Sequence, residues 1–170
     1  QTVTIDQIKQ AATQVKNYIE TNKKLPDTIT IGTATVTMPQ FLELLTTATI
    51  QINNNNYNPI PLKNSFTTPT SPMEYITSGN IYKTEYLAIA NSIKNYMDNT
   101  GKTPDYYYGT SLGSHIRYEN LIYMYSKIMD YYNTTGQKAT NVTMNSWANS
   151  AAKPVYLTSD RISTTAAEDW

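Results

Sequence analysis

The sequence predicts a helix-dominated α+β domain, in which two related helix–hairpin–helix repeats and a partial third repeat pack around one core. Residues 15–27 (VKNYIETNKKLPD) and 93–105 (IKNYMDNTGKTPD) align without a gap at a constant offset of 78 positions. Self-similarity at a fixed period is the signature of repeated supersecondary units. In addition, apolar residues fall at helical spacing in four segments, with short alternating or extended stretches between them.

The first repeat is expected over about residues 4–56. A T-x-x-Q capping box at Thr4 opens a helix with one apolar stripe, and Pro26 ends this region because the residue before a proline is pushed out of helix. Residues 28–37 alternate apolar residues with threonine around a glycine, which predicts a β-hairpin with one apolar face. A second T-x-x-Q box at Thr37 opens another helix, which a run of four asparagines stops.

The connecting segment 57–79 is rich in Pro, Asn, Ser and Thr. We expect an ordered strap, because its apolar residues Ile60, Leu62 and Phe66 can pack onto the repeats. A linker between two independent domains is the alternative.

The second repeat is expected over about residues 80–136, with both helix types present. Between its helices, residues 106–116 are expected to form a looser, glycine-containing extended stretch in place of the first hairpin. The motif then begins again in a partial repeat over residues 131–152. The whole domain is expected to span residues 1–157, followed by a tail over residues 158–170.

Composition narrows the possible partners. The 170 residues carry a formal net charge of zero, and only 15% are charged, which is below the typical quarter. No basic stretch is long enough to follow phosphates, so nucleic acid is not an expected partner. Abundant neutral hydroxyl and amide side chains suit a secreted surface that meets sugars or cell wall. A low-charge globular surface without a special partner is the alternative.

The absence of cysteine excludes disulfides, thiolate metal sites and a cysteine nucleophile. No apolar run approaches the roughly 20 residues of a membrane span, so no membrane insertion is expected from this segment. We expect no metal and no cofactor. The abrupt start and end of the sequence indicate a piece of a longer protein.

Several long strings resemble one known family, the pseudomurein-binding repeats of methanogen surface proteins. They are NYIETNKKLPDTITI followed by MPQFLELL, then PIPLKN, SGNIYKTEYLAIANSIKNYMDNTGKTPDYY and TSLGSHIRYENLIYMYSKIMDYY. The resemblance covers nearly everything from about Thr4 to Thr143. It implies an extracellular, non-catalytic module that holds an adhesin-like parent protein to the archaeal cell wall by binding pseudomurein.

Catalysis is poorly supported by the residues present. The endoisopeptidase found beside such repeats needs a cysteine nucleophile, which this chain lacks. A serine triad would need His115 as base, but no nucleophile-elbow motif is present. A glycosidase needs two carboxylates at a set separation, for which Glu43, Glu119 and Asp130 are candidates, but 13 acidic residues would offer such pairs by chance in any protein. A cell-wall hydrolase therefore stays an alternative, as does an adhesin module that contacts another glycan or cell surface.

Tyrosine is the most distinctive residue, with 15 copies against 2 of phenylalanine. A tyrosine offers an apolar face to a sugar ring and a hydroxyl for hydrogen bonds. Those on apolar helical stripes are expected in the core, namely Tyr18, Tyr96, Tyr125 and Tyr132.

The candidate ligand-binding residues lie between the helices of the second repeat: Tyr106, Tyr107, Tyr108, Ser111, His115 and Arg117. Neighbours in an extended stretch point to opposite faces, so either Tyr107 or the pair Tyr106 and Tyr108 must face outward. Arg117 could grip a carboxylate of a uronic acid or a wall peptide with two parallel bonds. The alternative role for Arg117 is a solvated charge near a helix start.

Overall fold

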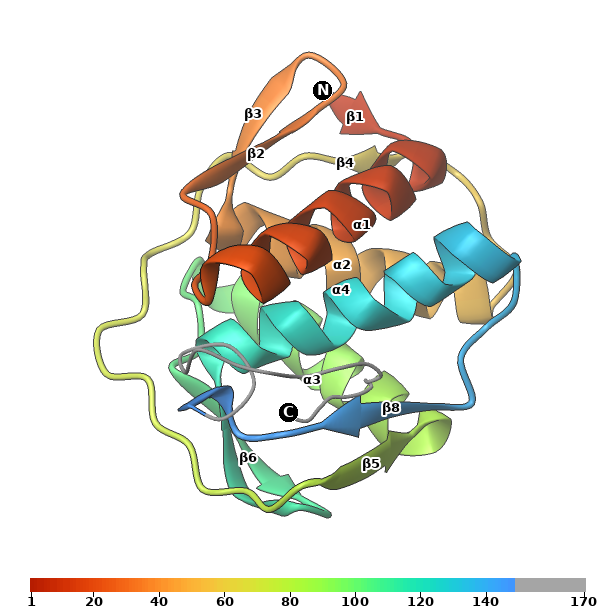
Figure 1. Ribbon diagram of the computed structural model, residues 1–170. Helices are drawn as coiled ribbons and strands as arrows, with labels where there is room; N and C mark the ends of the chain where they lie inside the picture. Colours follow the sequence, from red (N-terminus) through yellow and green to blue (C-terminus); the bar gives the residue numbers. More distant parts are fainter. Residues whose placement is uncertain (149–170) are drawn as a thin grey trace.

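The computed structural model describes residues 1–148, which run twice through the same order of elements, strand, helix, hairpin, helix and strand (Figure 1). The first pass comprises β1 (Thr2–Val3), α1 (Ile5–Asn22), β2 (Thr28–Ile31), β3 (Ala34–Thr37), α2 (Met38–Asn53) and β4 (Ile60–Pro61). The second comprises β5 (Gly79–Tyr82), α3 (Lys83–Thr100), β6 (Tyr106–Thr110), β7 (Gly113–Arg117), α4 (Tyr118–Thr135) and β8 (Asn141–Met144).

The helix limits follow from local chemistry. Both predicted capping boxes are confirmed: the backbone N–H of Gln7 donates to the Thr4 hydroxyl, and Gln40 does the same to Thr37. α1 and α3 have the same length and lie at the same offset of 78 positions. Each ends on a left-handed residue, Lys23 after α1 and Gly101 after α3.

Four antiparallel strand pairs join these helices. β2 pairs with β3 and β6 with β7 as hairpins, while β1 pairs with β4 and β5 with β8 across the length of each half. The hairpin over residues 28–37 is therefore confirmed. The pairs β1–β4 and β5–β8 join strands far apart in sequence, and each lies beside the start of the first helix of its half.

The expectation that residues 106–116 form a loose extended stretch is wrong. These residues form a regular hairpin whose strands are five residues long, one residue longer than the strands of the first hairpin. Three consecutive tyrosines hide the alternation of the strand, because tyrosine is suited both to a core-facing and to a water-facing position.

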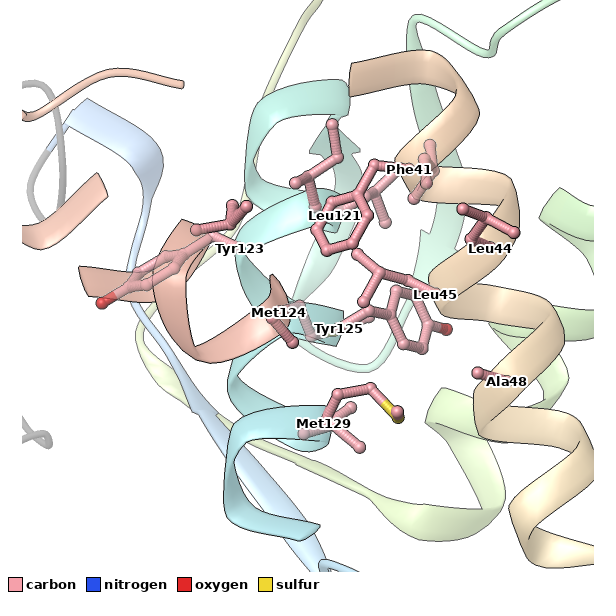
Figure 2. Close-up of a cluster of buried hydrophobic side chains, with 14 of the residues drawn as sticks. Phe41, Leu44, Leu45, Ala48, Leu121, Tyr123, Met124, Tyr125 and Met129 are labelled. Carbon is pink, nitrogen blue, oxygen red and sulfur yellow. The ribbon is translucent and has the colours of Figure 1, made fainter. Parts of the chain in front are cut away.

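The core lies where the two halves interlock. α1 packs chiefly on α4, and α3 packs on α2, so each first helix is covered by the second helix of the other half. α2 and α4 cross between them, where Phe41, Leu45 and Ala48 face Tyr125 and Met129 (Figure 2). All five side chains are buried.

The segment 57–79 runs along the outside of these helices. Ile60 is 1% exposed, while Leu62 and Phe66 pack partly buried against the core. The Gln40 side chain donates to two backbone carbonyls of this segment, at Lys63 and Asn64, over 2.8 Å each. We call residues 57–79 the strap.

The expected partial repeat falls on α4 and β8. Tyr131 belongs to the last turns of α4, and β8 pairs with β5. The limits of the domain and its repeats stay predictions, and residues 149–170, with the expected tail, lie outside the described residues. Within residues 1–148, no helix is both long and apolar enough to cross a membrane.

Candidate functional site

The strap and the second hairpin combine into one surface. The Tyr75 N–H donates to the His115 carbonyl over 2.9 Å, and the Thr77 N–H donates to the Leu112 carbonyl over 2.9 Å. The strap thus runs beside β7 and pairs with it through one isolated antiparallel bridge, between Tyr75 and His115. Gly113 permits this approach, since a Cβ added there would lie 2.1 Å from the Tyr75 carbonyl oxygen.

Four aromatic side chains gather on one face of this surface. His115 lies opposite Tyr108 in the hairpin and opposite Tyr75 in the strap. The centroid of its ring is 5.3 Å from each of those two rings and 4.3 Å from the ring of Tyr106, all edge-on. We call Tyr75, Tyr106, Tyr108 and His115 the tyrosine ladder.

Much of the tyrosine ladder is open to water. The Tyr75 side chain is 62% exposed and Tyr108 is 69% exposed. Large aromatic side chains are mostly well buried, so two exposed rings that flank His115 in one cluster are candidates for contact with a ligand.

The structure decides between the two orientations open to the three consecutive tyrosines. Tyr107 packs partly buried against the core, paired across the hairpin with buried Ile116. Tyr106 and Tyr108 point to the opposite face, toward His115.

The two polar candidates, Arg117 and Ser111, are engaged within the protein. The Arg117 guanidinium donates to both carboxylate oxygens of Glu119, over 2.8 and 3.2 Å. These hydrogen bonds raise the pKa of Arg117. The Ser111 N–H and hydroxyl both donate to the Glu85 carboxylate of α3, over 2.8 and 2.6 Å. A ligand carboxylate would therefore have to displace Glu119 to reach Arg117.

A groove opens beside the tyrosine ladder, between α3 and β6. It encloses about 460 Å³, within the usual range for small-molecule sites. The side of α3 contributes Ser92, Ile93 and Tyr96, and the other side is residues 104–108. Tyr96 is 43% exposed, so its expected place in the core is wrong.

The sequence does not predict two residues of this surface, Tyr75 in the tyrosine ladder and Tyr96 in the groove. Tyr75 lies in the strap, where only an extended alternation of Met73, Tyr75 and Thr77 hints at a strand. Tyr96 lies on an apolar helical stripe, but the groove separates this turn of α3 from β6, so its ring is not fully covered. By contrast Tyr125, expected in the core, is fully buried, and its hydroxyl donates to the Tyr86 carbonyl.

The strap is also fixed by a partly buried carboxylate. Glu74 accepts hydrogen bonds from the Asn120 side chain and from the backbone N–H groups of Arg117 and Trp147. Burial raises the pKa of Glu74, although these donors oppose the rise. The strap, the start of α4 and the turn after β8 are thereby joined at one point.

A second polar cluster lies away from the hairpin, around Glu43 of α2. This residue is 1% exposed, and its carboxylate accepts from Thr47 over 3.1 Å and lies 3.6 Å from the Lys63 ammonium. Lys63 also bonds Asp98 at 2.9 Å, and Asp98 pairs with Lys94 at 2.6 Å. Burial, together with a hydrogen bond with Asp98, raises the pKa of Glu43 to about 7.

The acids considered for catalysis are each held in the protein. Glu43 belongs to the buried cluster, Glu119 pairs with Arg117, and Asp130 accepts from the Thr13 hydroxyl over 2.7 Å. In the part of the chain that the structure describes, no three His, Cys, Asp or Glu residues group as a metal site would require.

Comparison with known proteins gives one match. The family model of the pseudomurein-binding repeat matches residues 1–31, which hold β1, α1 and β2. A search of curated proteins finds no match.

Proposed function

From the premise that residues 1–31 of this chain match the pseudomurein-binding repeat, we propose that the domain binds pseudomurein without catalysis and anchors a larger extracellular protein to the archaeal cell wall. Binding of this polymer, association with the wall and a binding rather than a catalytic role are what the family implies. The anchoring role and the residues that make contact are the finer steps of the proposal.

The exposed tyrosine ladder is the observation that supports this function best. Its four rings lie on β6, β7 and the strap, which backbone hydrogen bonds hold together, so their positions are fixed before a ligand arrives. A rigid aromatic surface binds sugar rings at low cost in side-chain entropy, because each tyrosine has only two side-chain torsions to fix.

The proposed roles divide the candidate residues into two groups. Tyr106, Tyr108 and His115 contact the ligand together with Tyr75. The other three, Tyr107, Ser111 and Arg117, hold the hairpin in place through the core, Glu85 and Glu119.

We further propose that the two halves are copies of one repeat in which only the second carries the ligand-binding hairpin. α1 and α3 have the same length and begin 78 positions apart, and the order of elements is the same in both halves. However, the first hairpin has Thr28, Ile29 and Thr30 where the second has three tyrosines. The domain limits of residues 1–157, with a partial third repeat, belong to the same proposal.

The test is co-sedimentation of the protein with purified pseudomurein sacculi, with bacterial murein as the control. We expect sedimentation with pseudomurein alone. Equal sedimentation with both polymers would instead favour a general glycan adhesin, and release of soluble fragments would favour a hydrolase.

A double variant, Tyr75→Ala with Tyr108→Ala, tests the tyrosine ladder. The loss of two stacking contacts should weaken wall binding by about 1–3 kcal/mol, while the melting temperature stays close to that of the parent. Tyr82→Ala is the matched control, because Tyr82 is 61% exposed but lies on β5. Equal binding by the double variant and the control would place the ligand elsewhere.

A further inference from the structure

The groove between α3 and β6 has the character of a site for a polar but uncharged ring. The residues that line it include the aromatic Tyr96, Tyr107 and Tyr108 and the polar Ser92 and Asp105. Aromatic faces suit the C–H faces of a sugar, and hydrogen-bonding groups at the rim suit its hydroxyls.

Asp105 is held in a defined position with one oxygen still available. Its Oδ1 accepts from the backbone N–H groups of Thr70 and Ser71 in the strap, over 3.0 and 3.2 Å. Its backbone carbonyl accepts from the Tyr118 N–H over 3.0 Å. No described residue donates to Oδ2, so this atom can accept a hydroxyl of a ligand, and hydrogen bonds to a carboxylate are strong.

The charge of the groove argues against an acidic ligand. Among the described residues that line it, Asp105 carries the only formal charge, and neither lysine nor arginine is present. A uronate or peptide carboxylate would meet repulsion from Asp105 without a cation to balance it. An ammonium group would be attracted to Asp105 and to the tyrosine faces as well, and the strong salt dependence of such an ion pair distinguishes it from an uncharged ring.

The first half of the chain lacks the aromatic wall. At the offset of 78 positions, Asp27 corresponds to Asp105 and Tyr18 to Tyr96, whereas threonine and isoleucine replace the three tyrosines of β6. Asp27 and Tyr18 are therefore matched controls for Asp105 and Tyr96, which line the groove but lie outside β6.

We propose that this groove binds an uncharged pyranose ring of the wall glycan, with Asp105 Oδ2 accepting its hydroxyls and Tyr96 and Tyr108 flanking it. The inference rests on the proposed function and specifies which part of the polymer this surface recognises. It assigns the groove to the glycan strand rather than to the peptide or to an acidic sugar.

The first part of the experiment compares variants by titration calorimetry with peptide-free pseudomurein glycan strands. Asp105→Asn keeps an amide oxygen for the strap N–H groups but turns the ligand-facing acceptor into a donor, so glycan affinity should fall about 5- to 10-fold. Tyr96→Ala should weaken binding to a similar extent. Asp27→Asn and Tyr18→Ala should bind like the parent, and thermal melting verifies that every variant is folded.

The second part varies the ligand. Glycan strands whose uronate carboxyls have been reduced to alcohols should bind as tightly as native strands, and 0.5 M salt should change the affinity less than twofold. Free wall peptide should not compete. Loss of binding on carboxyl reduction, competition by the peptide, or equal affinities of Asp105→Asn and Asp27→Asn would each overturn the inference.

The two proposals fail in different ways. Protein that sediments with sacculi but does not bind isolated glycan strands would disprove only the glycan site in the groove. Protein that does not sediment with sacculi at all would disprove the proposed function, and the glycan site would be rejected with it.

Discussion

At the scale of single residues, Glu43 has the most unusual environment. It faces Lys63 of the strap, Asp98 of α3 and Thr47 of its own helix, and one of its carboxylate oxygens has no hydrogen-bond donor. A buried group in this position is more stable when it is protonated, because burial penalises its charge more than one half-exposed lysine can offset.

The free energy of unfolding should therefore fall as the pH rises, because of Glu43. The folded pKa of Glu43 is about 7, above the ordinary 4.5, so the folded state keeps a proton that the unfolded state releases. This contribution is fully present below about pH 4.5 and is lost as the pH rises through about 7. Glu43→Gln should raise the free energy of unfolding at pH 8 by about 2 kcal/mol.

Urea unfolding at pH 5 and pH 8 measures this difference. Glu20→Gln is the control, because Glu20 is a partly exposed carboxylate on α1, and it should leave the fall with pH in place. A variant at Glu43 with the same dependence on pH as the parent would show that Glu43 stays charged.

The sequence located part of the candidate site at this scale. Alternation predicts that Tyr106 and Tyr108 share a face, but it cannot say which face is outside, since that depends on where α3 and α4 lie. The partner of Arg117 was not predicted either. Glu119 is only two positions away, but bonding between them requires the bend from β7 into α4.

At the scale of elements, the contact between the strap and the second hairpin depends on Gly113. The strap carbonyl of Tyr75 occupies the space that a side chain at this position would need. Gly109 in the same hairpin has a φ of +91°, and a Cβ added to it would meet nothing within 4 Å. Gly109 is therefore constrained by its backbone conformation alone.

Substitution of these two glycines separates the close contact from the strain of the turn. Gly113→Ala should lower the free energy of unfolding by about 2–3 kcal/mol and should make the strap more sensitive to protease near Tyr75. Gly109→Ala should cost about 1 kcal/mol through its backbone alone and should leave the strap protected. Equal protease sensitivity of both variants would show that the strap does not depend on β7.

Local signals predicted the helices well at this scale and the strands less well. Capping boxes and apolar stripes act within a few residues, so the limits of α1 and α2 can be read directly from the sequence. Strands β1 and β4 are two residues long and stabilise each other from positions almost sixty residues apart. No local pattern distinguishes such a pair from coil.

At the scale of the whole molecule, the interlocked helices predict a single cooperative unit. Because α1 is covered by α4 and α3 by α2, neither half retains its core when the other unfolds. Thermal and urea unfolding should each give one transition, with fluorescence and circular dichroism in agreement.

Limited proteolysis provides an independent check of cooperativity. The strap should resist cleavage as long as the helices are folded, because Ile60 and the Gln40 contacts hold it to them. Early cleavage between residues 57 and 71 that leaves two stable pieces would contradict this expectation. The offset of 78 positions predicts the repeated order of elements, but it does not reveal that the helices exchange partners between halves.

The exchange of partners also sets the order in which the chain can fold as it is made. α1 emerges first, but the surface that covers its apolar stripe belongs to residues more than one hundred positions later. Contacts this distant in sequence slow folding, since the intervening loop must close before they form. During synthesis α1 therefore lacks the helix that covers most of its apolar stripe until α4 has left the ribosome.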